Sequence, residues 1–321
     1  MIEQTSLRSP APLRIAVTGA AGLVGQNLIP RLKARGFTDI VAIDKHPANI
    51  AILRRLHPDI EVIAADLVRD DGWQNAVAKC DVVVVCHAQI GGLDPDAFKR
   101  NNEVATRRLL DVLGADKRAY LVQLSSSVVE SEAEDWYTQS KERQERIVVE
   151  SGLPYVVLRP TLMFGWFDRK HIGWLARFMR RVPIFPVPGN GRYPRQPLFV
   201  GDFCDIIMSF IARRPANAAY NISGQERIDY IDLMRKVKKA CGARVAIVRI
   251  PYGLFWGLLW TYGLFDRDPP FTTKQLEALV TPNVFEVIDW PSIFGVKATP
   301  LDQALEQTYH HPEYSKIVLD Y

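Results

Sequence analysis

Cysteine is scarce in this sequence of 321 residues. The chain has 4 cysteines, and none of them stands in a Cys-x-x-Cys pair or in a Cys/His cluster of the kind that holds zinc. We therefore expect neither a metal site nor a disulfide framework. Unpaired thiols are typical of a reducing compartment, so the sequence predicts a cytoplasmic protein.

Long apolar runs are also missing. The longest aromatic and apolar run, residues 252–265, covers about 14 residues, whereas a membrane-spanning helix needs roughly 20. This run is expected either to join the core or to lie on a membrane surface, which would make the protein membrane-peripheral. Residues 1–12 lack the apolar core of a secretory signal and are expected to form a flexible leader.

Acidic residues are absent from one long stretch, residues 169–201, although the formal net charge of the whole chain is only +4. A charge this small argues against a nucleic-acid-binding protein. The stretch is expected to be either a solvated basic face or the source of a positive field over an anionic ligand or a membrane surface. Its basic residues are Arg169, Lys170, Arg177, Arg180, Arg181, Arg192 and Arg195.

The first half of the chain alternates β-branched runs with amphipathic segments. Strict alternation predicts parallel βαβ units, whose strands are covered on both faces. The sequence therefore predicts an α/β fold, with a Rossmann-type doubly wound parallel sheet over residues 13–160 and a smaller C-terminal lobe, interleaved with it, over residues 161–321. The expected strands are 13–17, 40–43, 60–64, 82–85, 121–124 and 155–158, and the expected helices include 23–35, 97–113, 202–213 and 229–240. Prolines and glycines between residues 183 and 197 predict an irregular connection.

A glycine-rich turn joins the first expected strand to the first expected helix. Gly19, Gly22 and Gly25 have the spacing that allows a tight turn, the close approach of a pyrophosphate and close helix–strand packing. The amides at the start of the helix would bind the phosphates. We therefore expect this turn to bind a dinucleotide.

Two carboxylates follow the next two expected strands. Asp44 ends the second strand, where it would accept hydrogen bonds from the adenosine ribose and would repel a 2′-phosphate, which favours NAD over NADP. Lys45 weakens this preference because a basic side chain would shield such a phosphate, so NADP stays open. Asp66 follows the third strand, where the adenine is expected to lie.

A serine run and a Tyr-x-x-x-Lys pair come later in the same half. Ser125, Ser126 and Ser127 follow the fifth strand, while Tyr137 and Lys141 are placed to share one face of the next helix. A nearby ammonium would lower the phenol pKa from its ordinary value of about 10 and suit it to acid/base chemistry. A serine hydroxyl would polarise the substrate oxygen, so this group predicts chemistry at an alcohol or carbonyl carbon.

Taken with these groups, several further motifs make the chain resemble an extended short-chain dehydrogenase/reductase of the NAD-dependent epimerase/dehydratase family. The resemblance implies an NAD-dependent enzyme that transfers hydride at a carbinol or carbonyl carbon, with a C-terminal substrate-binding lobe and a homodimeric assembly. The motifs that carry it are Thr18–Gly25, Asp66-Leu67, Cys86-His87-Ala88, Asn102–Thr106 with Ala105 in place of glycine, Leu158-Arg159-Pro160, Arg195–Asp202 and Tyr220–Gly224.

The resemblance also assigns roles to residues. Tyr137 would be the acid/base, Lys141 would hold the nicotinamide ribose, and Ser127 would be the catalytic serine, with Ser126 as its rival. Substrate contacts would come from Gln89, Ser126 and the clamp Arg195. The implied cofactor contacts are Gly19, Ala21, Gly22, Leu23, Val24, Gly25, Asp44, Asp66, Leu67, His87, Ala88, Asn102, Tyr137, Lys141 and Pro160.

Two departures from the family pattern narrow the function. Val128 and Val129 stand where sugar-nucleotide 4,6-dehydratases carry an Asp-Glu pair, which argues against dehydration and leaves a nucleotide-sugar 4-epimerase or 4-ketoreductase as the leading expectation. The short interval between Ser127 and Tyr137 predicts an open pocket. With the apolar run at 252–265, such a pocket would also suit a 3β-hydroxysteroid-type or lipid-linked substrate. A non-catalytic dinucleotide-binding accessory subunit is the remaining alternative.

Overall fold

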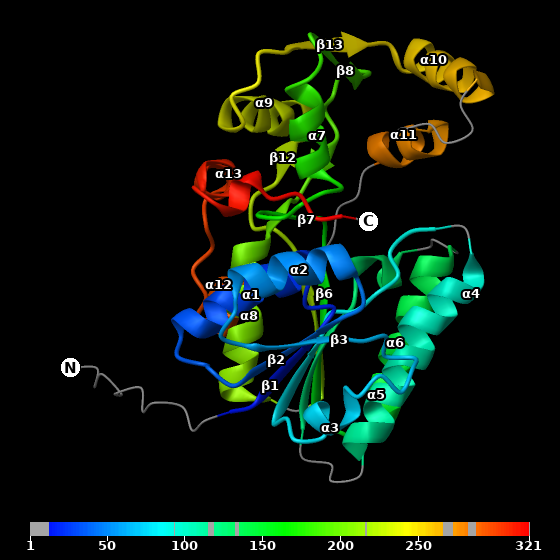
Figure 1. Ribbon diagram of the computed structural model, residues 1–321. Helices are drawn as coiled ribbons and strands as arrows, with labels where there is room; N and C mark the ends of the chain where they lie inside the picture. The colour runs from blue at the N-terminus through cyan, green and yellow to red at the C-terminus, as the bar shows by residue number, and fades with distance from the viewer. Residues whose placement is uncertain are drawn as a thin grey trace.

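The computed structural model describes residues 13–92, 94–114, 119–131, 135–215, 217–265, 272–281 and 287–320, and the leader predicted at 1–12 lies outside them. Seven parallel strands form the main sheet in the order β11-β6-β5-β4-β1-β2-β3 (Figure 1). The strand order reverses between β1 and β4, which is where doubly wound sheets bind ligands. The strands are β1 (Ile15–Thr18), β2 (Ile40–Asp44), β3 (Glu61–Ala64), β4 (Val82–Val85), β5 (Tyr120–Leu124), β6 (Tyr155–Pro160) and β11 (Ala218–Ile222).

Helices cover both faces of this sheet, as the predicted doubly wound fold requires. One face packs against α1 (Leu23–Ala34), α2 (Pro47–Leu56), α8 (Val200–Arg213) and α12 (Trp290–Phe294). The other face packs against α3 (Gln74–Val77), α5 (Ala105–Gly114) and α6 (Trp136–Glu150). Because helices cover both faces, a strand such as Val82–Val85 is apolar and buried at every position. Such runs between amphipathic segments are the pattern that predicted this fold.

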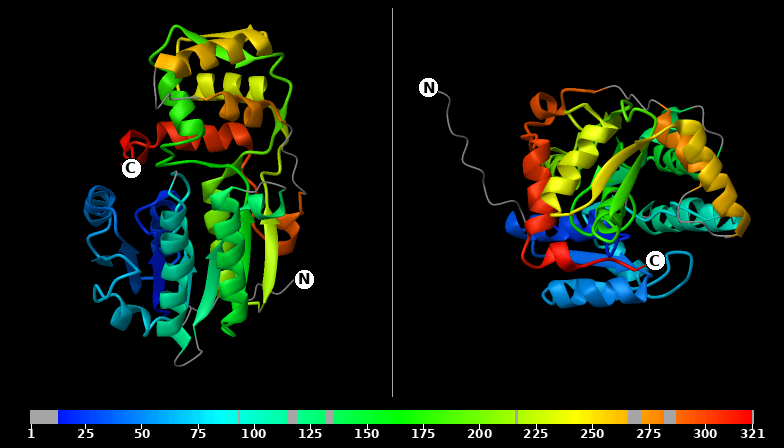
Figure 2. Two further views of the ribbon diagram at one scale, coloured as in Figure 1. Left: turned by 90° about the vertical axis from the view of Figure 1, so that its right-hand side faces the viewer. Right: turned by 90° about the horizontal axis from the view of Figure 1, so that it is seen from above.

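The chain after residue 160 builds a second lobe over the carboxyl ends of the strands, and it also returns to the first lobe through α8, β11 and α12 (Figures 1 and 2). The second lobe has its own apolar core. Its larger elements are α7 (Ile172–Met179), β8 (Ile184–Pro188), α9 (Tyr230–Ala240), β13 (Ala246–Ile250), α10 (Tyr252–Phe265), α11 (Thr273–Val280) and α13 (Leu301–His310). Shorter elements are α4 (Pro95–Phe98), the π-helix η1 (Lys99–Val104), the 3-10 helices η2 (Ser127–Glu130) and η3 (Tyr314–Lys316), β7 (Met163–Phe164), β9 (Pro194–Arg195), β10 (Leu198–Phe199) and β12 (Ile228–Asp229).

The predicted irregular connection at 183–197 is wrong in part, because β8 lies within it. This strand pairs in parallel with β13, and Pro186 stands opposite Val248. Proline lacks an amide donor and is normally excluded from a central strand. In a two-stranded sheet each strand has an unpaired edge, so prolines that argued against a strand are tolerated here.

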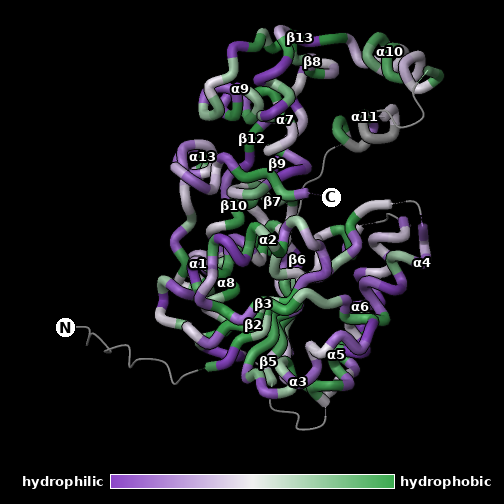
Figure 3. The backbone as a smooth tube through the Cα atoms, viewed as in Figure 1, coloured by the Kyte–Doolittle hydropathy of each residue, from purple (hydrophilic) through white to green (hydrophobic). Residues whose placement is uncertain are grey.

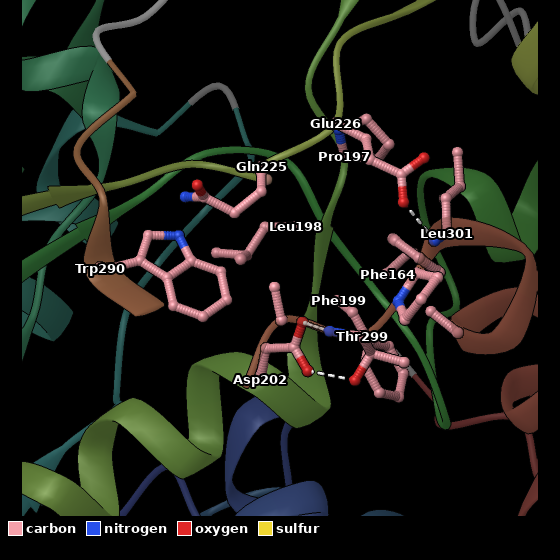
Figure 4. A pocket seen from close by; sticks show the side chains of 14 residues that line it. Phe164, Pro197, Leu198, Phe199, Asp202, Gln225, Glu226, Trp290, Thr299 and Leu301 are labelled. Carbon is pink, nitrogen blue, oxygen red and sulfur yellow. Dashed lines mark hydrogen bonds between the residues drawn. The ribbon is translucent and has the colours of Figure 1, made fainter. Parts of the chain in front are cut away.

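A small cavity of about 150 Å³ lies where the two lobes meet, beside the start of α8 (Figure 4). Asp202 lines it with only 4% of its surface exposed. Its carboxylate accepts hydrogen bonds from the Thr299 amide at 2.9 Å and from the Thr299 hydroxyl at 2.6 Å. Burial nevertheless raises the Asp202 pKa from 3.8 to about 6, since the two bonds offset only part of the cost of desolvating the charge.

We predict that Asp202→Asn removes a pH-dependent part of the stability. The native state holds the Asp202 proton more tightly than the unfolded chain, so this group stabilises the fold below pH 4 and loses that contribution as the pH rises to about 6. The rise of the Asp202 pKa from 3.8 to about 6 corresponds to at most about 3 kcal/mol in the free energy of unfolding. Urea unfolding at pH 4 and pH 8 should therefore show the variant gaining stability relative to the parent at the higher pH. An equal difference at both pH values would contradict this account.

Candidate active site

The glycine turn packs tightly against the loop that follows β4. Gly19 has a φ of +64°, and a Cβ atom there would lie 2.8 Å from the backbone of His87. A Cβ at Gly25 would lie 2.4 Å from the Ala20 carbonyl oxygen. Gly22 is the N-cap of α1 and has no side chain. No side chain therefore caps the first amides of that helix, which begin at Leu23. A backbone this close and a helix start of this kind fit a dinucleotide pyrophosphate.

Asp44 is fixed at the edge of this turn. Its Oδ2 accepts a hydrogen bond from the Ala21 amide at 2.9 Å, and its Oδ1 accepts one from the His46 amide at 3.0 Å. Lys45 points to other partners, since its Nζ donates to Asn101 Oδ1 at 2.7 Å and lies 3.6 Å from Asp66 Oδ2. The carboxylate is thus fixed beside the glycine turn, while the neighbouring ammonium is engaged by Asn101 of η1 and by Asp66 after β3.

The residues predicted beside the adenine close the end of β3. Asp66 Oδ1 accepts a hydrogen bond from the Val68 amide at 3.2 Å, which shapes the turn. Leu67 is buried in the core beneath α5 and α6. On the opposite side of the site, the buried Pro160 ends β6, where it stands opposite Ile222 of β11.

Asn102 ties the loop after β4 to α6. It lies fully buried in η1, where the wider π-helical turn interrupts the predicted helix at 97–113. The Gln89 amide donates to Asn102 Oδ1 at 2.6 Å, and Asn102 Nδ2 donates to the Ser140 hydroxyl at 2.8 Å. The loop that carries His87, Ala88 and Gln89 is therefore held in register with the helix that carries Tyr137.

Tyr137 and the serine run meet at the start of α6. The Ser126 side chain, which also caps η2, interacts with the Tyr137 phenol and favours its ionised form. Ser127 is the first residue of η2 and is 5% exposed. This arrangement favours Ser126 as the partner of the phenol, and the catalytic role of Ser127 stays a prediction.

Lys141 does not lower the phenol pKa in this structure, contrary to our expectation. Burial raises the pKa of Tyr137, and the bond from Ser126 offsets only part of that rise. The Lys141 ammonium is 1% exposed and donates to the Leu124 carbonyl at 2.7 Å and to Gln144 Oε1 at 2.5 Å. Its own pKa falls to about 8 because burial penalises the charge. A desolvated ammonium needs close acceptors, and the end of β5 supplies one.

Arg195, the predicted substrate clamp, already binds other groups of the protein in this structure. Its guanidinium donates to the carbonyl oxygens of Leu279 and Thr281 at the C-terminal end of α11 and lies 5.4 Å above the Tyr193 ring. The last carbonyls of a helix have no partner within the helix, so they attract a cation. A substrate contact by Arg195 would have to compete with these bonds.

Two groups near the site were missed as site residues in the sequence. Lys170, from the acid-free stretch, has its Nζ 3.8 Å from the position of a Cβ on Gly91, so it reaches the loop after β4. Gln144 lies one turn after Lys141 on α6 and binds its ammonium. The i to i+3 spacing would have indicated Gln144, whereas the position of Lys170 depends on how the two lobes pack.

Comparisons with known proteins agree with this geometry. The model of the NAD dependent epimerase/dehydratase family matches residues 15–223. A ceramide reductase from Caulobacter vibrioides is 23% identical over 84% of this chain and 81% of its own, and a dTDP-glucose 4,6-dehydratase from Streptomyces niveus is 25% identical over 74% and 80%. The fold superposes on a UDP-glucuronic acid 4-epimerase from Bacillus cereus solved with NAD, with a TM-score of 0.68, 21% identity, and coverage of 92% of this chain and 97% of that one.

We predict that Gly25→Ala weakens NAD binding. The new Cβ would lie 2.4 Å from the Ala20 carbonyl oxygen, so α1 must move away from the turn. Overpacking of this kind costs about 1–3 kcal/mol, which corresponds to roughly 5- to 150-fold in affinity. Isothermal titration with NAD measures the loss. Gly114→Ala is the matched control, because a Cβ there meets nothing within 4 Å. Equal affinities in the two variants would show that the tight turn does not hold the cofactor.

Proposed function

Because the chain belongs to the NAD-dependent epimerase/dehydratase family, we propose that this NAD-dependent enzyme is a nucleotide-sugar 4-epimerase or 4-ketoreductase. The observation that carries the proposal is that Ser126, Tyr137 and the buried Lys141 lie at the carboxyl edge of the sheet that also carries the glycine turn, where the Ser126 side chain favours the ionised phenol. The second lobe lies over this edge, which supports its role in substrate binding (Figure 1).

Tyr137 supplies the proton chemistry in this proposal. Because burial raises its pKa, the phenol is protonated at neutral pH and acts as the acid when a ketone is reduced. The carbonyl carbon gains the hydride and its oxygen gains the Tyr137 proton, while the Ser126 hydroxyl orients the phenol. The bound dinucleotide supplies or accepts the hydride. In the reverse direction Tyr137 has to lose its proton, which the Ser126 side chain favours, and the role left to Lys141 is to hold the nicotinamide ribose.

The surroundings of Ser127 support redox chemistry without dehydration. Val128 and Val129 have no group that exchanges protons. Glu130 is the nearest following acid, and it accepts from Arg159 Nη1 at 2.6 Å and from Asn221 Nδ2 at 2.6 Å. A carboxylate held by two such donors is poorly placed to remove a proton from a substrate.

The charge above the site supports an anionic substrate. Lys170 reaches the loop after β4, and the acid-free stretch 169–201 runs through the second lobe. A nucleoside diphosphate carries negative charges that such a field would attract. Turnover of UDP-glucuronic acid and UDP-glucose tests this class. An epimerase recycles NAD and leaves the absorbance at 340 nm steady, whereas a ketoreductase changes it.

We predict that Tyr137→Phe lowers kcat by about 10²- to 10⁴-fold, the usual contribution of a positioned acid/base. The loss is measured as product formed per enzyme with the substrate that the parent turns over. Tyr155→Phe on β6 is the matched control, because it removes a phenol outside the site. Unchanged activity of Tyr137→Phe would contradict the proposal and would favour the non-catalytic accessory subunit.

A lipid-linked or steroid-like substrate is the second candidate, and α10 favours it. All residues of this helix are exposed or half-buried, and the helix contains no charged residue (Figure 3). Its exposed side chains include Leu254, Leu258, Trp260, Leu264 and Phe265. Apolar residues surround the helix on every side instead of forming one stripe, which suits immersion in lipid better than docking in a protein groove.

The length of α10 supports contact with a membrane surface. At 1.5 Å per residue its 14 residues extend about 21 Å, less than the hydrocarbon core of about 30 Å. Among the residues that the structure describes, no helix is both long and apolar enough to cross a membrane. The proposal is therefore that α10 lies in the interface, which would bring the enzyme to a membrane-held substrate.

We predict that the parent protein floats with phosphatidylcholine vesicles containing anionic lipid and that the double variant Leu258→Glu, Leu264→Glu does not. Both side chains are more than half exposed, at 54% and 64%, so the fold should tolerate the change. Ile293→Glu on α12 is the control, since Ile293 is 49% exposed on the other lobe. Absence of the parent from the vesicle fraction would exclude membrane contact.

We also propose a cytoplasmic homodimer. The four cysteines, Cys80, Cys86, Cys204 and Cys241, are all unpaired, which supports a reducing compartment. The homodimer stays a prediction from the resemblance, and light scattering of the purified protein tests it.

A further inference from the structure

A chain of hydrogen bonds links Lys141 to the glycine turn. Gln144 Oε1 accepts from Lys141 Nζ at 2.5 Å, and Gln144 Nε2 donates to the Thr106 hydroxyl at 2.9 Å. The Thr106 hydroxyl lies 3.1 Å from His87 Nε2, and His87 Nδ1 lies 2.8 Å from the Thr18 hydroxyl. Lys141, Gln144, Thr106 and Thr18 are at most 1% exposed. The chain thus crosses the interior from α6 to the end of β1.

Either tautomer of a neutral His87 satisfies every link. The ammonium only donates, so the Gln144 oxygen faces Lys141 and its nitrogen faces Thr106. In one tautomer the Thr106 hydroxyl donates to His87 Nε2 and His87 Nδ1 donates to the Thr18 hydroxyl, which lies 3.5 Å from the Val84 carbonyl oxygen. In the other tautomer His87 Nε2 donates to Thr106 and the Thr18 hydroxyl donates to His87 Nδ1. Burial lowers the His87 pKa to about 3, so His87 is neutral at physiological pH.

We propose that Gln144, Thr106 and His87 form a positioning chain that fixes the Lys141 ammonium and couples it to the glycine turn. Thr18 directly precedes Gly19, and the His87 backbone is the surface against which Gly19 packs. Any displacement of this turn is therefore transmitted through side chains to Lys141. None of the three residues needs to touch a substrate, so each is a positioning residue, and this inference rests on the proposed function of Lys141.

The pKa of Lys141 depends on the groups around its ammonium, and this dependence makes the positioning chain testable. Its ammonium is faced by Glu145 on its own helix and by Cys86 and His87 after β4. Glu145 is held by Arg159, whose Nη2 donates to it at 2.7 Å. Removing the Gln144 oxygen takes away an acceptor that favours the charged lysine and should lower its pKa below about 8. Placing a carboxylate there should raise it.

We predict that Gln144→Met and Gln144→Glu shift the pH dependence in opposite directions. NAD affinity, measured by titration calorimetry between pH 6 and pH 10, should weaken in the parent as Lys141 loses its proton. The alkaline limb, which is the pH range in which NAD affinity falls, should lie about one pH unit lower in Gln144→Met and about one pH unit higher in Gln144→Glu. In an assay with the substrate that the parent turns over, kcat of Gln144→Met should fall by up to about 100-fold with little change in KM.

Thr106→Val breaks the chain without touching Lys141. It should lower kcat in the same sense as Gln144→Met, whereas Thr308→Val should leave kcat unchanged. Thr308 is equally suited as a control, because its hydroxyl is buried and bonded only within α13, to Ala304 at 2.7 Å. Thermal unfolding of both valine variants shows whether they fold alike.

The outcomes separate this inference from the proposed function. If the parent binds NAD but turns over no nucleotide sugar and no lipid alcohol, the proposed function is overturned. The NAD titrations still test the positioning chain in that case. Alkaline limbs that coincide, or that move the same way in Gln144→Met and Gln144→Glu, overturn the positioning chain. A Thr106→Val variant as active as Thr308→Val overturns it as well.

Discussion

A lysine ammonium is buried where β5 meets α6, and the arrangement of the site depends on how that charge is accommodated. Taking Lys141 out of water costs free energy, as its lowered pKa shows, and the fold compensates with the Leu124 carbonyl and the Gln144 amide. The same helix begins at Trp136, and the phenol of its second residue, Tyr137, interacts with Ser126 just after the same strand. The buried charge therefore fixes α6 against β5, and with it the distance between the proton donor and the sheet edge.

The glycine turn is the second constraint, and it acts through close contact. Gly19 packs against the backbone of His87, while Gly25 lets α1 approach the turn itself. Because His87 is also hydrogen-bonded to Thr18, the loop after β4 cannot move without disturbing the turn. In the proposed function, this packed unit at the point where the strand order reverses would bind the dinucleotide beside the acid/base residue of α6. The relatives include one named for a lipid, ceramide, and one named for a nucleotide sugar, dTDP-glucose.

The sequence predicted the parts of the fold that local pattern determines. Runs such as Val82–Val85 are apolar at every position, so the strands and the doubly wound sheet were predictable, and so was the glycine turn. Features that depend on distant partners were not. The prolines of β8 argued against a strand, because the sequence does not show that β8 pairs with β13 in a two-stranded sheet that tolerates them. The guanidinium of Arg195 binds α11, which lies far along the chain. Of the two acceptors of Lys141, the Leu124 carbonyl lies on another element, whereas Gln144 was within reach of a spacing argument.

Deuterium transfer tests the central claim of hydride chemistry at a carbinol carbon most directly. The protein is incubated with NADH carrying deuterium at the transferable position of C4, together with a UDP-4-keto sugar in one reaction and a lipid ketone in another. The account predicts deuterium on the carbinol carbon of one of the two products, seen by mass spectrometry, and loss of that label in Tyr137→Phe. Label that stays on the cofactor with both ketones would contradict it.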